Sequence, residues 1–238
     1  MSGSIPHSIG SLPLLEFLNL QVNHLAGPVP QTIFNMSTLQ VLALTYNHGL
    51  TGPVLGNISF SLPMLQRISI GANSFTGQIP LGLRACRFLQ RIDMTENLFE
   101  GVLPTWLGSL SHLTFLSLGG NSLIGPIPAE LGNLTMLDTI DLSLCNLTGA
   151  IPVEFGQMRQ LSLLLLSANQ LTGFIPASLG NLSEFGYMGL DRNQLVGTIP
   201  PQLCNMNSLF FISVSANNLQ GGFQFHVDSF ELPTTFLP

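Results

Sequence analysis

The sequence predicts an α/β solenoid of about nine stacked repeats of 24 residues, and three observations lead to that fold class. A segment with leucine-type residues at three fixed positions recurs along the chain. In nearly every unit an asparagine follows that segment, and then a glycine and an Ile-Pro pair. A chain that repeats a unit of this length forms a stack in which each unit contacts its neighbours.

The frame of the repeat is set by nine leucine-type positions. They are 24 residues apart, except for one step of 26 between Leu39 and Leu65. One additional residue falls within Asn47–Leu50, and the other lies between Gly52 and Leu65, where Leu55 replaces the usual proline. The nine positions are Leu15, Leu39, Leu65, Leu89, Leu113, Leu137, Leu161, Phe185 and Leu209.

Each unit is expected to begin with a short strand. In the segment Leu113–Leu118 the leucines stand at positions 113, 116 and 118, and the spacing of two between the last two is the period of a strand with one buried face. Strands of successive units then stack at about 4.8 Å into a parallel sheet. The Gly-x-Ile-Pro corner suits a tight bend followed by extended chain. The Leu131–Leu134 type of segment predicts a short helical or 3-10 turn.

Buried asparagines are expected where each unit turns inward, because their amides can satisfy backbone groups of adjacent turns. Cys145 takes this position once, and we expect Cys86 and Cys145 to be buried free thiols. The asparagines are Asn23, Asn47, Asn73, Asn97, Asn121, Asn169, Asn193 and Asn217.

The corner Leu-x-Gly-x-Ile-Pro followed by Leu-Gly-Asn-Leu is best preserved in Leu123–Leu134 and Leu171–Leu182. It closely resembles the plant extracellular type of leucine-rich repeat. From Gly3 to about Gly221 the sequence resembles part of the ectodomain of a plant leucine-rich-repeat receptor-like kinase of the defence or pattern-recognition kind. The resemblance implies a right-handed superhelix with a parallel concave sheet, a second small sheet beside it and 3-10 or helical segments on the convex side.

The same resemblance implies a receptor at the extracellular face of the plasma membrane. Its partners would be a peptide, protein or glycan ligand, together with a co-receptor kinase. Such receptors also carry a signal peptide, a paired-cysteine cap, a membrane helix and a kinase, and the sequence shows none of these. We divide the chain into a solenoid over 1–222 and a non-repeat tail over 223–238, either a partial cap strand with Phe223 and Phe225 or the end of a truncated gene product.

The charge is low and acidic. Charged residues make up 8% of the chain, and 12 acids against 6 bases give a net charge of −6. The sequence has no basic stripe, so we expect neither nucleic acid nor an anionic membrane surface as a partner. The histidines follow no metal-ligand spacing, and no catalytic motif is present. We therefore predict a binding protein without catalytic residues, metal or cofactor.

The ligand is expected on the outward strand positions, which have no role in the core. Arginines and aromatic residues dominate binding energy at interfaces. Arg67 and Arg91 on neighbouring units suggest a clamp for a carboxylate, although Asp93 is an alternative partner for Arg91. The plainer interpretation is that aromatics favour the sheet and arginines favour solubility. The candidates are Arg67, Arg91, Asp93, Phe115, Thr139, Leu163, Tyr187 and Phe211.

Five Asn-x-Ser/Thr sequons are candidate N-glycosylation sites, and three share one repeat phase on the expected convex rim. They are Asn35, Asn57, Asn133, Asn146 and Asn181. Two other functions stay open beside the receptor fragment. One is a secreted leucine-rich-repeat inhibitor of a cell-wall-degrading enzyme, and the other is a truncated gene product without a role of its own.

Overall fold

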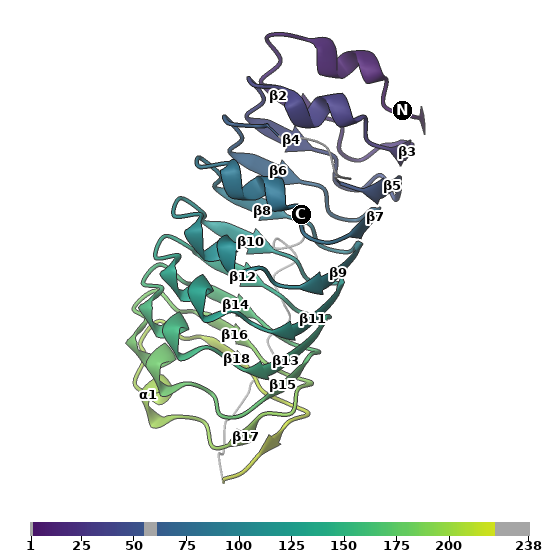
Figure 1. Ribbon diagram of the computed structural model, residues 1–238. Coiled ribbons are helices and arrows are strands. Elements are labelled where there is room, and N and C mark those ends of the chain that lie inside the picture. Colours follow the sequence, from purple (N-terminus) through teal and green to yellow (C-terminus); the bar gives the residue numbers. More distant parts are fainter. Residues whose placement is uncertain (1, 55–60, 222–238) are drawn as a thin grey trace.

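The computed structural model describes residues 2–54 and 61–221. The chain winds into an elongated stack of short coils, from the purple N-terminal units to the yellow C-terminal ones (Figure 1). The 3-10 turns follow one side of the stack, and the strands of a second sheet follow the other side (Figure 1). A regular coil among the described residues therefore contributes one strand to the concave sheet, one strand to the second sheet and one turn.

The concave sheet has nine parallel strands of three residues each, in strict sequence order. Each strand pairs in register with the next, so that residues 24 positions apart lie side by side, or 26 positions apart at the irregular step. The strands are β2 (Phe17–Asn19), β4 (Val41–Ala43), β6 (Arg67–Ser69), β8 (Arg91–Asp93), β10 (Phe115–Ser117), β12 (Thr139–Asp141), β14 (Leu163–Leu165), β16 (Tyr187–Gly189) and β18 (Phe211–Ser213).

The second sheet is also parallel and has eight strands, and a further pair of strands lies beyond it. Its strands are β1 (Ser2–Gly3), β3 (His24–Pro28), β5 (Gly49–Pro53), β7 (Ser74–Gly77), β9 (Leu98–Val102), β11 (Ser122–Pro126), β13 (Asn146–Ala150) and β15 (Gln170–Thr172), and the pair is β17 (Val196–Gly197) with β19 (Asn218–Leu219). The glycines at the corner adopt positive φ, for example Gly125 at 79°, as the tight bend requires.

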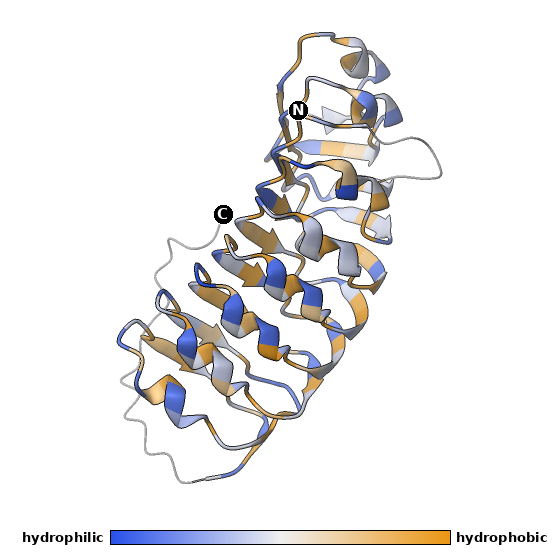
Figure 2. Ribbon diagram, turned by 60° about the vertical axis from the view of Figure 1, so that its left-hand side comes forward, coloured by the Kyte–Doolittle hydropathy of each residue, from blue (hydrophilic) through white to orange (hydrophobic). Residues whose placement is uncertain are grey.

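Within the described ranges the turns are 3-10 helices, except in the unit that contains Pro201. They are η1 (His7–Ser11), η2 (Gln31–Asn35), η3 (Leu81–Ala85), η4 (Thr105–Ser109), η5 (Ala129–Asn133), η6 (Val153–Gln157) and η7 (Ala177–Asn181), and α1 (Pro201–Cys204) takes their place between β17 and β18. Hydrophilic and hydrophobic residues alternate along these turns, because one side of each faces the core (Figure 2). The predicted 3-10 segments and second sheet are confirmed.

The core is a column of leucine-type side chains that runs the length of the stack. Leu113, Leu116 and Leu118 of one unit are at most 1% exposed, and their counterparts in the neighbouring units are buried as well. Burial of one such side chain contributes about 1.5–3 kcal/mol. The nine predicted strand starts are confirmed, since every concave strand begins two residues after one of them.

The asparagine ladder joins consecutive units, as predicted. The Asn97 amide donates to the carbonyl oxygen of Ile70 in the preceding unit at 3.1 Å and to that of Met94 in its own unit at 3.3 Å. Its Oδ1 accepts the backbone N–H of Phe75 at 3.0 Å. Each such side chain satisfies buried backbone groups that the short strands leave unpaired.

Next to the irregular step, one hydrogen bond of this ladder is missing. The additional residue after Asn47 puts His48 in the left-handed region, at φ 59°. Leu25 N–H donates to Asn47 Oδ1 in the regular way, but in the next unit Asn73 Oδ1 accepts no hydrogen bond, although it is buried. The second additional residue lies between Gly52 and Leu65, where residues 55–60 fall outside the described ranges.

The repeat pattern continues to Gly221 in the described part of the chain. The tail over 223–238, with Phe223 and Phe225, lies outside the described residues, as does the replacement of proline by Leu55. Within residues 2–54 and 61–221, every helix is too short to cross a bilayer.

Candidate functional site

The concave sheet brings all the predicted binding residues except Asp93 into one column across seven neighbouring strands, β6 to β18. Arg67 pairs with Arg91, Arg91 with Phe115, and the register continues to Phe211. Arg67 is exposed, and Arg91, Phe115, Leu163, Tyr187 and Phe211 are partly exposed. This surface, which we call the concave column, therefore presents large side chains to solvent on six of the seven units, all except the unit of Thr139.

Arg91 is held in place by two neighbours. Its guanidinium carbon lies 3.5 Å from the centroid of the Phe115 ring, and its Nη2 lies 3.6 Å from Asp93 Oδ2. The pairing with Asp93 is thus the arrangement in the structure. Arg67 forms no ion pair with any described residue. The carboxylate clamp stays a prediction, and Arg67 is the arginine that is free to take part in it.

Two of the predicted residues are less accessible than expected. Asp93 is 6% exposed and Thr139 is 7% exposed, so neither is an open contact position. Asp93 is covered because Arg91 lies against it and the Thr95 hydroxyl donates to its Oδ1 at 2.8 Å. The Thr139 hydroxyl donates to Asp138 Oδ2 at 2.9 Å. The sheet spacing of about 4.8 Å lets large neighbours shield small side chains between them.

The C-terminal end of the concave column is aromatic. The rings of Tyr187 and Phe211 are stacked, with centroids 4.1 Å apart and planes 9° apart. Phe210 lies edge-on to Tyr187 with centroids 6.5 Å apart, and it is 80% exposed. Phe210 was not among the candidates predicted from the sequence. Its position, one residue before the strand, holds Glu16, Gln40 or other mostly polar residues in other units, and that difference was a usable signal.

A second row of side chains runs beside the column and joins carboxylates to hydroxyls. Asp141 accepts hydrogen bonds from the hydroxyls of Ser143 at 2.6 Å and of Ser117 at 3.0 Å. The hydrogen bond from Ser117 crosses from one unit to the next, because Ser117 and Asp141 are in register. The row therefore connects neighbouring units by side chains as well as by backbone.

Asp191, at the repeat position of Ser143, also joins neighbouring units through hydroxyl hydrogen bonds. Burial alone would raise the pKa of Asp191, but hydrogen bonds from Ser167, Arg192 and Ser213 outweigh it and lower the pKa. The distances to Asp191 are 2.5 Å from the Ser167 hydroxyl, 3.0 Å from Arg192 Nε and 3.2 Å from the Ser213 hydroxyl. Asp191 is therefore a charged, fully hydrogen-bonded group beside the aromatic end of the column.

Four of the five sequons lie in the described part of the chain, and their asparagines are exposed. Asn35, Asn133 and Asn181 each end a 3-10 turn, which confirms that they share one position in the repeat. Asn146 begins β13 of the second sheet. Asn57 lies outside the described residues. Glycosylation at these positions remains a prediction.

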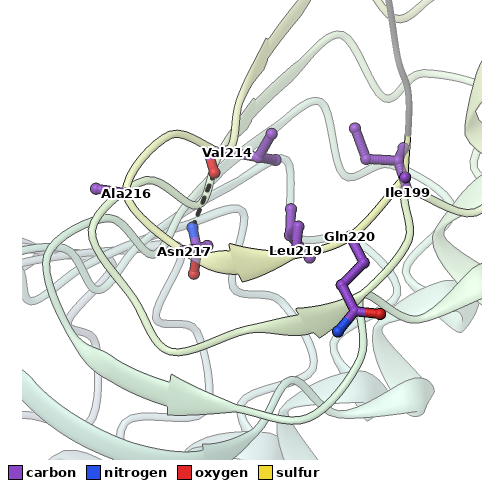
Figure 3. A pocket seen from close by; sticks show the side chains of 7 residues that line it. Ile199, Val214, Ala216, Asn217, Leu219 and Gln220 are labelled. Atoms are coloured by element: carbon purple, nitrogen blue, oxygen red, sulfur yellow. Dashed lines mark hydrogen bonds between the residues drawn. The ribbon is translucent and has the colours of Figure 1, made fainter.

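Two hollows lie away from the concave column. One, of about 230 Å³, opens at the end of the last described unit between Ile199, Val214 and Leu219 (Figure 3). Asn217 donates to the Val214 carbonyl oxygen there at 3.0 Å. Val214 has the same repeat position as Leu190, which is buried by the following unit. This hollow therefore lies on the surface against which one unit of the solenoid stacks on the next. The other lies between η3 and η4 and is described below.

Comparison with known proteins identifies the repeat. The family model "Leucine Rich Repeat" matches residues 112–134, 136–158 and 160–182. The chain has the fold of a leucine-rich-repeat solenoid. Its fold matches that of the plant peptide hormone receptor RGFR1, solved in complex with RGF2, with a TM-score of 0.86 and 35% identity, over 92% of this chain and 35% of that one.

Other relatives of this leucine-rich-repeat chain are also plant proteins. The Arabidopsis receptor kinase HAESA, solved with the peptide hormone IDA and the co-receptor SERK1, has 28% identity and a TM-score of 0.78, over 92% of this chain and 40% of that one. Receptor-like protein 41 of Arabidopsis thaliana is 37% identical over 76 residues, 31% of this chain and 8% of that protein. The predicted resemblance to plant leucine-rich-repeat receptor ectodomains is confirmed, and the chain spans well under half of each of these relatives.

A plant ice-binding protein has the same fold, with 28% identity and a TM-score of 0.73, over 86% of this chain and 73% of that one. One solenoid fold thus carries different functions, and function has to be argued from the surface of this chain. Among the described residues no three His, Cys, Asp or Glu side chains are arranged to hold a metal ion.

Proposed function

We propose that this chain is a ligand-binding segment of a plant receptor ectodomain, which recognises an extracellular peptide or protein on its concave column and has no catalytic role. The observation that carries the proposal is the set of arginine, aromatic and leucine side chains on six of the seven strands from β6 to β18, in an otherwise sparsely charged chain. These residue types supply most of the binding energy at protein interfaces. Two structural relatives are solved with peptide hormones.

The geometry suits an extended peptide that crosses the strands. Arg67 at one end offers an unpaired guanidinium to a carboxylate. The stacked pair Tyr187 and Phe211, with the exposed Phe210, offers an apolar contact at the other end. Five strand spacings of about 4.8 Å separate β6 from β16, or about 24 Å, which about seven extended residues span.

The remaining predictions belong to this proposal. An extracellular location and glycan attachment at the exposed sequons are consistent with a receptor ectodomain. A co-receptor kinase is proposed as a further partner, since the HAESA structure includes the co-receptor SERK1. An ice surface repeats regularly, whereas the concave column changes from Phe17 through Arg67 to Thr139, so the ice-binding alternative has no support from this face.

The test is a binding screen with the full glycosylated chain against synthetic peptides that carry free C-terminal carboxylates. We expect Arg67→Ala and Tyr187→Ala each to weaken binding of a selected peptide about tenfold or more. Phe174→Ala is the matched control, because Phe174 is aromatic and 68% exposed but lies outside the concave column. Peptide binding that is equally strong in both concave variants, or no peptide binding at all, would refute the proposal.

A further inference from the structure

The arginines of this chain are concentrated in one part of it. The chain has no lysine, and four of its six arginines lie between residues 67 and 91. No Asp or Glu occurs between Glu16 and Asp93. Arg67 and Arg91 lie on the concave sheet, whereas Arg84 is on η3 and Arg87 follows it.

Arg84 occupies a position that is glycine in most units. The corresponding residues are Gly10, Gly108, Gly132, Gly156 and Gly180. A Cβ built at Gly132 would lie 2.5 Å from the Glu154 Cβ and 2.7 Å from its carbonyl oxygen in the next turn. Glycine is therefore what allows neighbouring turns to pack closely, and a larger residue requires them to move apart.

The turns do separate at Arg84. η3 and η4 pack far less closely than the regular pairs η4–η5, η5–η6 and η6–η7. A cavity of about 350 Å³ opens here and is lined by Arg84, Arg87, Ser109, Leu110, Ser111 and His112. Neither arginine forms an ion pair with any described residue. The replacement of glycine by arginine thus opens the cavity and also places a cation in it.

We propose that this cavity, between η3 and η4, binds a tetrahedral oxyanion, the sulfate or phosphate group of a ligand. Two guanidinium groups three residues apart supply several N–H donors with the geometry that such oxygens accept. The Ser111 hydroxyl and the His112 ring line the same space, while the Ser109 hydroxyl already donates to the Trp106 carbonyl oxygen at 2.6 Å. The site is separate from the concave column, so it does not depend on the proposed function.

The charge of the surroundings favours an anion over a neutral ligand. Arg84 and Arg87 lie in the acid-free stretch, the described residues that line the cavity include no Asp or Glu, and Glu130 lies on η5, beyond η4. The cavity volume is in the range of small-molecule sites, about 300–1,000 Å³, so it has room for the group that carries the oxyanion as well.

The test is calorimetric titration of the full chain with inorganic sulfate, inorganic phosphate and a sulfated heparin oligosaccharide, with acetate as the carboxylate probe. We expect one of the tetrahedral anions, free or carried on the oligosaccharide, to bind more tightly than acetate. Arg84→Gln and Arg87→Gln should each weaken that binding about tenfold or more. The three ligands distinguish a free anion from one carried on a polymer.

Arg159→Gln is the matched control, since Arg159 has the same repeat position as Arg87 but lies beside the close-packed turns η6 and η7. Its binding should be unchanged. Arg84→Gly, which restores the usual glycine, should close the cavity and abolish binding while the thermal melt remains cooperative. The proposal is overturned if acetate binds as tightly as sulfate and phosphate, if no anion binds, or if Arg159→Gln weakens binding as much as Arg87→Gln.

Discussion

The guanidinium carbon of Arg91 lies 3.5 Å from the centroid of the Phe115 ring, on the adjacent strand of the concave sheet. This contact explains why Arg91 and Arg67, although in register, do not act as an equivalent pair. Arg91 is shared between the Phe115 ring and the Asp93 carboxylate, whereas Arg67 has no ionic partner among the described residues. The concave column is thus partly organised before any ligand is present.

The stacking of Arg91 on Phe115 should be measurable as a coupling energy. In a double-mutant cycle of Arg91→Ala and Phe115→Ala, we expect the two residues to be coupled by about 0.5–1 kcal/mol at this partly exposed site. Urea denaturation of the four proteins gives the value. The cycle of Arg67→Ala with Phe115→Ala serves as the control and should give a coupling near zero.

The asparagine ladder should respond unequally to substitution. Asn97→Ala leaves the N–H of Phe75 without a partner and removes one of two donors from the carbonyl oxygens of Ile70 and Met94, to which Asn73 and Asn121 still donate. We expect a loss of about 1–3 kcal/mol in the free energy of unfolding. Asn73→Ala removes hydrogen-bond donors only, since Asn73 Oδ1 accepts no hydrogen bond. It should therefore lower the free energy of unfolding by about 1 kcal/mol less than Asn97→Ala does. Equal losses in denaturant melts would contradict this account of the irregular step.

The glycines between neighbouring turns should be intolerant of even a methyl group. Gly132→Ala places a Cβ 2.5 Å from the Glu154 Cβ, and we expect a loss of about 1–3 kcal/mol in stability. The control is Ala177→Gly on the surface of η7, which should lower the stability by less. Gly27→Ala is unsuitable as a control, because Gly27 has a φ of 84° that alanine rarely adopts. Thermal unfolding followed by circular dichroism checks the order of the two variants.

The three thiols should differ in reactivity. Cys86 and Cys145 are buried and Cys204 is exposed. A disulfide reagent at pH 8 should therefore modify Cys204 alone in the folded protein, and all three thiols after denaturation. Spectrophotometric thiol counting, repeated on Cys204→Ser, tests this. A rapid reaction in the Cys204→Ser protein would show that one of the buried thiols is accessible.

Burial also predicts a loss of stability at alkaline pH. Burial raises the pKa of the Cys86 thiol to about 12, from an ordinary value of 9.0. In the window between these values the unfolded chain loses this proton and the folded chain keeps it, so stability is complete below pH 9 and falls as the pH rises toward 12. Urea midpoints measured from pH 8 to 11 should decline more steeply in the parent than in Cys86→Val, where this thiol is absent.

The irregular unit could be located from the sequence, but its hydrogen bonding could not be predicted. The 26-residue step marks an insertion near Asn47, and periodicity alone was sufficient to find it. That the insertion leaves Asn73 Oδ1 without a partner depends on the path of the backbone through His48, which no spacing rule describes. The gap between η3 and η4 could not be predicted from spacing either. The sequence shows that Arg84 replaces a glycine, but it does not show how far the two turns separate.

The amino-acid sequence alone is sufficient to predict the period, the strand positions, the asparagine ladder and the column of outward residues, because a repeat fixes which side chains face the core and which face out. How the outward side chains contact one another is seen only in the folded chain. The stacking of Arg91 on Phe115 and of Tyr187 on Phe211, and the opening beside Arg84, depend on lateral contacts between units. Those contacts join residues about 24 positions apart, and their geometry follows from strand spacing and rotamers that local sequence does not encode.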